Sequence, residues 1–180
     1  IPAIVSPGKS VVLPLFPEFI TPQDGDLKQD CEYKAARRWL ARGHEELGSR
    51  AVTLLGDDLY ARQGIGEAVL ERGWDFILTC KPTSHKHLEE TVQIQNFNGN
   101  IQKLTTSCWD GKHKITQEYR WARNVPLREK ESMLVNWVEI SSFDETGKPG
   151  YHNSFITSHY VEEANVAQIV AAGRARWKIE

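Results

Sequence analysis

The fold is decided by residues 51–82, which read AVTLLGDDLYARQGIGEAVLERGWDFILTCKP. Two short runs, Ala51–Leu55 and Phe76–Cys80, are apolar on both faces, a pattern typical of central strands that helices cover. The apolar residues between these runs recur at helical spacing: Ile65, Ala68 and Val69. Gly73 follows the last turn, as a helix-stopping residue should. The stretch therefore predicts strand, helix, strand, the signature of an α/β fold.

Upstream of this unit, the chain predicts two strands and a helix. Ile1–Ile20 is β-branched and apolar with a break at Ser6-Pro7-Gly8, which indicates two short strands joined by a tight turn. Pro14 cannot donate to a sheet ladder, so its strand is expected at an edge. Helical spacing then runs from Asp26 to Leu47, with apolar residues four apart at Leu27, Cys31, Ala35 and Trp39.

Downstream, the pattern of apolar residues changes from helical to strand-like and then becomes helical again. A helical piece through Leu88 and Val92 gives way to polar, turn-rich sequence. Strand-like runs follow at Ile115–Trp121, Met133–Ile140 and Ser154–Val161. From Glu163 onward the spacing is helical again, and four residues are expected to share one face: Ala164, Ala167, Val170 and Trp177. The whole pattern predicts an α/β sheet with flanking helices and a β-rich insertion before the last helix.

Composition excludes several classes of protein. The 180 residues are 40% hydrophobic and 26% charged, which is typical of one globular domain. No apolar run approaches the ~18 residues of a membrane span, and the N-terminus lacks a signal-peptide pattern, so a cytoplasmic protein without membrane contact is expected. Three cysteines without CxxC spacing do not support a disulfide framework or a zinc site. The net charge of -2 does not favour nucleic-acid binding, so a prediction of such binding depends on local clusters of basic residues.

Carboxylates occur at two positions where they could carry chemistry. Asp57 and Asp58 follow a predicted buried strand, and side chains at such strand ends enter the ligand crevice of open α/β sheets. Taken alone, either Asp could instead turn the chain or cap the next helix. Arg176 and Glu180 are four residues apart on one predicted helix, so their side chains share a face. Taken alone, that pair would be a solvated salt bridge.

Together these two segments resemble the DDE transposases encoded by bacterial insertion sequences. The C-terminal segment GRARWKIE, residues 173–180, is similar to the family signature Y-x2-R-x3-E-x6-K, in which Arg176 and Glu180 match R-x3-E. The resemblance implies that Trp177 and Ile179 pack this helix on the core. Gly173 stands where the family has tyrosine, and the lysine would fall beyond the last residue. TLLGDDLY, residues 53–60, resembles the segment that carries the family's second catalytic aspartate.

The resemblance implies an RNase H-like mixed sheet and a two-metal phosphoryl-transfer reaction. Asp57 and Glu180 would be catalytic metal ligands for two Mg²⁺ ions, with Mn²⁺ as a substitute, because carboxylate oxygens suit these cations. Arg176 would contact a DNA phosphate or orient Glu180. The implied activity is cutting transposon-end DNA and joining it to target DNA. The implied partners are double-stranded DNA and a second copy in the DNA complex, which places the protein at the nucleoid.

The resemblance also implies that the chain is part of a longer parent protein. An RNase H-like sheet has the strand order 3-2-1-4-5, with the first catalytic aspartate on the central first strand, and Ile1–Ile20 resembles strands two and three. The early acids Asp24, Asp26 and Asp30 lie in or before the first predicted helix and do not replace that aspartate. The expected division is a core over 1–97, a β-rich insertion over 98–160 and a C-terminal helix over 161–180. Without the first strand, the chain is expected to be inactive.

A local basic stretch predicts DNA contact. Between Lys112 and Lys130 six Lys or Arg face two acids, and Tyr119 and Trp121 interleave with them, a combination that suits phosphates and base stacking. The predicted DNA-binding residues are Lys112, Lys114, Arg120, Trp121, Arg123, Arg128, Lys130, Arg174 and Lys178. The resemblance suggests that one tryptophan stacks on a displaced base, with Trp109, Trp121 and Trp137 as candidates. A solvated hairpin with one buried aromatic face is the alternative. His85 and His87 are expected to be surface residues.

Two other functions remain open at this point. A different RNase H-like nuclease, of the resolvase or repair type, would have much the same acidic site and would hydrolyse DNA without strand transfer. A non-catalytic DNA-binding remnant would keep the basic stretch and lack the chemistry, as the missing strand and Gly173 suggest. The R-x3-E segment and the β-rich insertion before it favour the transposase.

Overall fold

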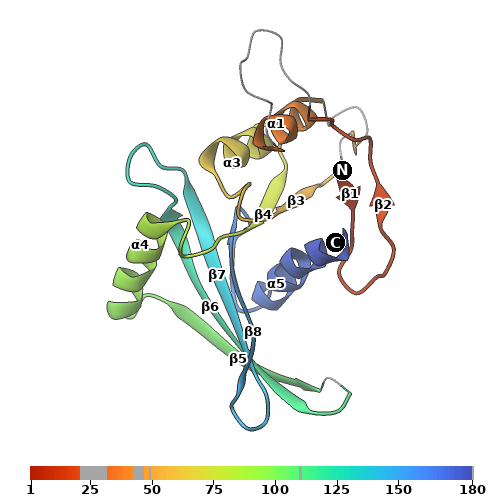
Figure 1. Ribbon diagram of the computed structural model, residues 1–180. Coiled ribbons are helices and arrows are strands. Elements are labelled where there is room, and N and C mark those ends of the chain that lie inside the picture. The colour runs from red at the N-terminus through yellow and green to blue at the C-terminus, as the bar shows by residue number, and fades with distance from the viewer. Residues whose placement is uncertain (21–31, 43–46, 49, 110, 180) are drawn as a thin grey trace.

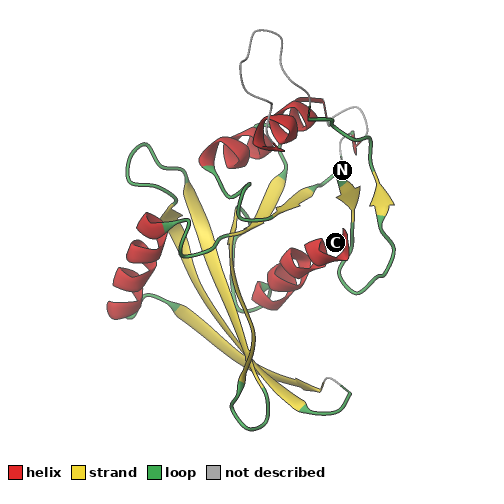
Figure 2. Cartoon of the chain, viewed as in Figure 1, coloured by secondary structure: helices red, strands yellow, loops and turns green. Residues whose placement is uncertain are grey.

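The computed structural model describes residues 1–20, 32–42, 47–48, 50–109 and 111–179. Its centre is a six-stranded mixed sheet with the strand order β3-β4-β8-β7-β6-β5 (Figure 1). Helices cover both faces of this sheet, so the chain has three layers (Figure 2). The α/β class predicted from the sequence is therefore confirmed. None of the helices in the described ranges is both long enough and apolar enough to cross a membrane.

Strand β3 (Thr53–Gly56), helix α3 (Gln63–Leu70) and strand β4 (Asp75–Thr79) form the predicted strand-helix-strand unit. β3 and β4 are parallel, with Leu54 opposite Phe76. Gly73 adopts a φ of 68°, a left-handed conformation that glycine tolerates best, so it stops the helix as predicted. Helix α1 (Glu32–Arg42) lies within the predicted helix Asp26–Leu47, of which residues 26–31 and 43–46 lie outside the described part.

The second half of the sheet is an antiparallel meander. It consists of β5 (Gln102–Trp109), β6 (Lys114–Pro126), β7 (Leu134–Phe143) and β8 (Pro149–Thr157). The sequence did not single out β5, because this edge strand is polar and largely exposed and so lacks a clear alternation. Because β8 also pairs with β4, the segment 98–160 and the strand-helix-strand unit share one sheet.

Two hydrophobic clusters hold the layers together. On one face α1, α3 and α4 (Lys86–Phe97) pack against the sheet, and this cluster contains Leu40, Ile65 and Leu88. On the other face helix α5 (Val166–Ala175) covers Ile77 and the aromatic residues of β6. Successive residues of β4 thus enter opposite clusters, as the apolar run on both faces predicted.

The apolar stripe of α5 differs from the prediction. Val170 is buried as expected, but the other buried positions of α5 are Val166, Ile169, Gly173 and Ala175, whereas Ala164 and Ala167 are exposed. Larger aliphatic side chains occupy the core-facing positions, since they bury more apolar area than alanine does. The short 3₁₀ helix η1 (Arg176–Ile179) follows, and its Trp177 is 53% exposed, so the expectation that Trp177 and Ile179 pack on the core is wrong.

Gly173 marks the closest approach of α5 to the sheet. A Cβ added there would lie 2.8 Å from Cε1 of the buried Phe155 and 3.1 Å from Cγ2 of Ile77. A large side chain such as tyrosine has no room at this position. The close packing of α5 on β4 and β8 thus requires a very small residue at position 173.

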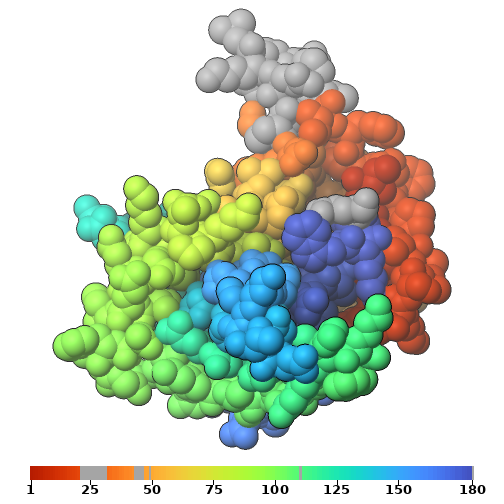
Figure 3. All heavy atoms as spheres, turned by 60° about the horizontal axis from the view of Figure 1, so that its bottom comes forward, coloured from red at the N-terminus to blue at the C-terminus, as the bar shows by residue number. Residues whose placement is uncertain are grey.

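The N-terminal residues form a separate small sheet. β1 (Ala3–Ile4) and β2 (Leu13–Pro14) pair in antiparallel fashion, so the predicted hairpin is present with very short strands. It lies beside the C-terminal segment (Figure 3), where Lys178 Nζ donates to the carbonyl oxygens of Ser6 and Lys9. Large apolar side chains of this region are exposed: Ile1, Ile4, Val11, Leu13, Phe16, Phe19 and Ile20.

We predict that Gly173→Ala lowers the stability of the chain. Alanine gains up to about 1 kcal/mol over glycine inside a helix, but overpacking a close contact costs about 1–3 kcal/mol. The exposed Ala171 provides the control, because Ala171→Gly should cost the helix-propensity difference alone. Urea unfolding measures both variants. A Gly173→Ala protein more stable than wild type would show that α5 does not pack this closely.

Candidate functional site

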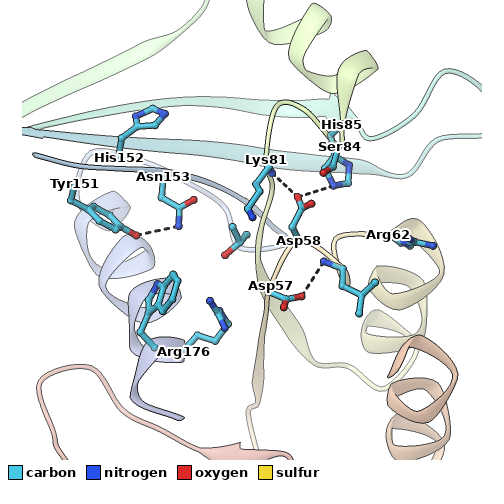
Figure 4. A pocket seen from close by; sticks show the side chains of 13 residues that line it. Asp57, Asp58, Arg62, Lys81, Ser84, His85, Tyr151, His152, Asn153 and Arg176 are labelled. Atoms are coloured by element: carbon cyan, nitrogen blue, oxygen red, sulfur yellow. Dashed lines mark hydrogen bonds and ion pairs between the residues drawn. The ribbon is translucent and has the colours of Figure 1, made fainter. Parts of the chain in front are cut away.

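A cavity of about 680 Å³ lies at the carboxyl ends of β3 and β4 (Figure 4). Four segments line it: the β3–α3 loop, the β4–α4 loop, the first half of β8, and the start of η1. Its lining residues include Asp57, Asp58, Arg62, Lys81, His85, Tyr151, His152, Asn153 and Arg176.

Strand geometry explains why these segments meet. β3 and β4 are parallel, so their carboxyl ends lie at the same edge of the sheet. β8 runs antiparallel to β4, with Phe155 opposite Thr79, and Ser154 O accepts a hydrogen bond from Cys80 N. Residues 151–153 therefore extend beyond the end of β4 and form a wall of the cavity.

Asp57 lies in the cavity, at the strand end that the sequence predicted. Its Oδ1 accepts a hydrogen bond from Leu59 N at 3.0 Å, and its carbonyl accepts one from Tyr60 N. Within the described residues, this carboxylate accepts no other hydrogen bond. Asp57 is thus held by its own loop, and Oδ2 remains available to a ligand.

Asp58 does not cap the next helix, which was one alternative that the sequence left open. Its Oδ1 accepts a hydrogen bond from Lys81 N at 2.6 Å and lies 3.4 Å from His85 Nε2. The side chain is only 18% exposed. Asp58 therefore joins the β3–α3 loop to the β4–α4 loop, a contact that depends on the parallel pairing of two strands and that sequence spacing does not reveal.

His85 is part of this site and not a surface residue. Its side chain is 12% exposed, and burial lowers the pKa of the imidazole below its usual value. The carboxylate of Asp58 opposes this shift, and the positive charge of Arg62 reinforces it. The sequence could have indicated this contact only by position: His85 follows the end of one predicted strand, and Asp58 follows the end of the neighbouring one.

Cys80 lies at the end of β4 but does not supply a reactive thiolate. Burial raises the pKa of its thiol strongly, and the carboxylates of Asp58 and Glu89 raise it further. The thiol therefore stays protonated at neutral pH.

The C-terminal part of the predicted site is described in part. Arg176 lines the cavity, and its guanidinium carbon lies 4.5 Å from the ring centroid of Trp177. Glu180 lies outside the described residues. The structure thus brings Arg176 and Asp57 to one cavity, and the predicted convergence of Asp57 and Glu180 stays a prediction. Within the described ranges, no group of three or more His, Cys, Asp and Glu side chains gathers as metal ligands.

The wall from β8 was missed by sequence reasoning. Asn153 Nδ2 donates to Tyr151 Oη at 3.2 Å, and the guanidinium carbon of Arg174 lies 4.2 Å from the Tyr151 ring centroid. His152 completes this wall. Their position depends on how far β8 extends past β4, which is a property of register.

The predicted basic stretch is divided between the two ends of β6. Lys112 and Lys114 are exposed at the β5–β6 hairpin, whereas Arg128 and Lys130 are exposed in the β6–β7 loop. The 13 residues of β6 separate these ends by about 40 Å at roughly 3.3 Å per residue. The stretch is therefore not one continuous patch.

The residues in the middle of the stretch contact other parts of the chain. Trp121 is only 2% exposed and packs in the α5 cluster, so the prediction that it stacks on DNA bases is wrong. Arg120 donates to Glu139 Oε1 at 2.8 Å and to Asn96 Oδ1 at 3.1 Å. The guanidinium carbon of Arg123 lies 4.5 Å from the Tyr160 ring centroid.

The tryptophan candidates are now distinguishable. Trp137 is buried, as Trp121 is, whereas Trp109 is 67% exposed at the end of β5. Of the three, Trp109 is the one whose ring is accessible for stacking.

We predict that His85 makes the stability of the chain depend on pH. Because the folded state lowers its pKa, the unfolded chain takes up the proton first as the pH falls below the usual value of about 6.5. The contribution of the neutral imidazole to the free energy of unfolding is therefore complete above the usual pKa. It is lost as the pH falls toward the pKa of the folded state. His85→Gln should flatten the fall in unfolding free energy between about pH 7 and about pH 5. His87→Gln is the control, and equal pH profiles for wild type and His85→Gln would contradict the prediction.

In comparisons with known proteins, no family model matches the chain, and no curated protein matches it. The functional conclusion therefore depends on the residues of the cavity and on their geometry.

Proposed function

We propose that this chain is part of the catalytic domain of a DDE-type transposase of bacterial insertion sequences, which cuts and joins DNA strands at transposon ends. One observation carries the proposal: Asp57 and Arg176 come from two segments far apart in the sequence and line the same cavity. These are the segments that resemble the second aspartate region and the R-x3-E helix of the family. Their meeting at the carboxyl edge of parallel strands supports a shared site.

The arrangement of strands supports an RNase H-like fold as part of this proposal. β3 is an end strand of the large sheet and pairs with β4 on one side. Its other edge has no strand partner in the described part of the chain. The β1–β2 sheet exposes the large apolar side chains of Ile4 and Leu13, and Phe16 and Phe19 are exposed just after it. A further strand between these two sheets would satisfy the open edge and cover apolar surface, as an RNase H-like first strand would.

The donor set at the cavity is suited to a hard divalent cation. Asp57 has a carboxylate oxygen without a hydrogen bond in the described part of the chain, and carboxylate oxygens are the ligands that Mg²⁺ and Mn²⁺ prefer. We propose that Asp57 and Glu180, with an aspartate from the parent protein, hold two such ions. When bound, they would activate the attacking oxygen and stabilise the leaving oxygen of the phosphodiester.

Side chains of the cavity would orient the DNA strand. Arg176 carries a planar guanidinium that suits a phosphate, and Lys81 adds a cation from the β4–α4 loop. Arg174 lies next to the β8 wall, above Tyr151. The proposed partners are double-stranded DNA at transposon ends and targets, and a second copy of the protein in the DNA complex.

The first test is cleavage of transposon-end DNA by the parent protein. Asp57→Asn keeps an acceptor for Leu59 N but removes the charge, so cleavage should fall by more than the 10- to 100-fold typical of outer-shell partners. Glu180→Gln should behave alike. Glu90→Gln is the control, because Glu90 lies exposed on α4 and does not line the cavity. Full cleavage by Asp57→Asn would remove Asp57 from the catalytic residues.

Strand transfer separates the proposed transposase from its alternatives. A transposase joins the cut 3′ end to target DNA, whereas a resolvase-type or repair nuclease stops at hydrolysis. A DNA-binding remnant would bind the ends and cut neither strand. Cleavage without joined product would favour the nuclease.

The second test locates the DNA surface. The hairpin end of β6 combines Lys112 and Lys114 with the exposed ring of Trp109, and Arg128 and Lys130 lie exposed in the loop at its other end. If Lys112 and Lys114 each neutralise one phosphate, their joint replacement by Ala should reduce the salt slope of DNA binding by about 2. Arg128→Ala with Lys130→Ala is the matched control and should leave the slope unchanged. The reverse result in a gel-shift titration would place the DNA at the β6–β7 loop.

A further inference from the structure

We propose that Asp58 and His85 form a positioning pair that fixes Asp57 and Lys81 at the cavity. The inference rests on the proposed function, in which Asp57 is a catalytic residue. Asp58 and His85 would not touch the DNA. They would act through the two loops that carry Asp57 and Lys81.

The pair joins two loops that the chain connects through α3 and β4. Asp58 belongs to the β3–α3 loop, and its Oδ1 accepts the Lys81 N–H across the strand ends at 2.6 Å. A carboxylate that accepts a backbone N–H at this distance makes a charge-assisted hydrogen bond, roughly twice as strong as a neutral one. The Asp58 side chain is 18% exposed, so its carboxylate is largely shielded from water, although Lys81 itself is exposed.

Lys81 is held from both sides of its peptide unit. Its N–H donates to Asp58, and its carbonyl oxygen accepts hydrogen bonds from Ser84 N at 3.0 Å and His85 N at 3.2 Å. The backbone from which the Lys81 side chain enters the cavity is thereby fixed. Figure 4 shows this side chain between Asp58 and Asn153.

His85 places a ring nitrogen close to the same oxygen. Its Nε2 is buried, has no hydrogen bond in the described part of the chain, and lies 3.4 Å from Asp58 Oδ1. A buried ring nitrogen without a partner is costly, and a shift of a few tenths of an ångström would bring it within hydrogen-bond distance of Asp58. The charged groups that face this imidazole are Asp58 and Arg62.

The position of Asp57 depends on its neighbour. Asp57 makes one side-chain hydrogen bond, from Leu59 N, and Asp58 is the next residue. Rotation of Asp58 away from Lys81 N would turn the peptide that joins the two aspartates. It would also disturb the turn closed by Tyr60 N on Asp57 O and Ala61 N on Asp58 O. Asp58 thus restrains the carboxylate that faces the cavity.

The experiment compares Asp58→Ala, Asp58→Asn, His85→Ala and His85→Gln with His87→Gln as the matched control. Asn keeps an oxygen that accepts from Lys81 N, and Gln keeps an N–H donor near the place of Nε2. Hydrogen exchange of the Leu59 and Lys81 amides reports the positions of Asp57 and the loop in the 180-residue chain. DNA cleavage by the parent protein gives kcat and KM separately.

We expect Asp58→Ala to speed exchange at both amides and to lower kcat about 10- to 100-fold, with KM for DNA little changed. Asp58→Asn should retain most of the protection. His85→Ala should have a smaller effect in the same direction, and His85→Gln should restore most of the rate.

Two outcomes would overturn the inference: unchanged exchange at Leu59 and Lys81 in Asp58→Ala, or faster exchange in this variant with unchanged kcat. A loss caused by general unfolding would also speed exchange of the buried β4 amides, which therefore serve as the internal reference. If the wild-type parent protein fails to cut DNA, the proposed function fails. Faster exchange at Leu59 in Asp58→Ala would still show that Asp58 positions Asp57.

Discussion

The pairing of β4 with β8 is the interaction on which the rest of the structure depends. It is the one ladder that joins the strand-helix-strand unit to the antiparallel meander in the large sheet. Side chains reinforce it at both ends, because Thr157 Oγ1 donates to Phe76 O and Ser154 Oγ donates to Cys80 O. This pairing places residues 151–153 beside the end of β4 and brings α5 across the sheet. Without it, Asp57 and Arg176 would have no common cavity.

The stability of that pairing comes from burial on both faces of β4. Phe76 and Leu78 enter the cluster beneath α1, α3 and α4, whereas Ile77 enters the cluster beneath α5. Each of these side chains contributes about 1.5–3 kcal/mol by leaving water. The burial continues to Cys80, one residue past the strand, and the exposed Lys81 follows it. The same strand therefore provides the core and, one residue later, the floor of the site.

The sequence predicted the features that depend on local pattern. The strand-helix-strand unit, the stop at Gly73 and the place of Asp57 follow from periodicity and from the end of an apolar run. In contrast, Trp121 was misread because charged and aromatic residues alternate along β6. The alternation correctly indicates a strand, but Tyr119 and Trp121 face the α5 cluster, while Arg120 lies beside Glu139 and Asn96. A one-dimensional pattern shows that two faces differ and does not show which face is covered.

The parts of the site that sequence missed depend on contacts across strands. His85 becomes part of the cavity only because β3 and β4 end at the same edge, and Asn153 only because β8 extends past them.

The same geometry resolves how two adjacent aspartates can serve a site proposed for an anionic strand. Two free carboxylates would repel phosphate and each other. Here Asp58 is engaged by the Lys81 N–H and lies beside His85, whereas Asp57 faces a cavity that Arg62, Lys81 and Arg176 also line. The division leaves one carboxylate available to a cation and surrounds it with positive side chains, which is the balance that a phosphodiester requires.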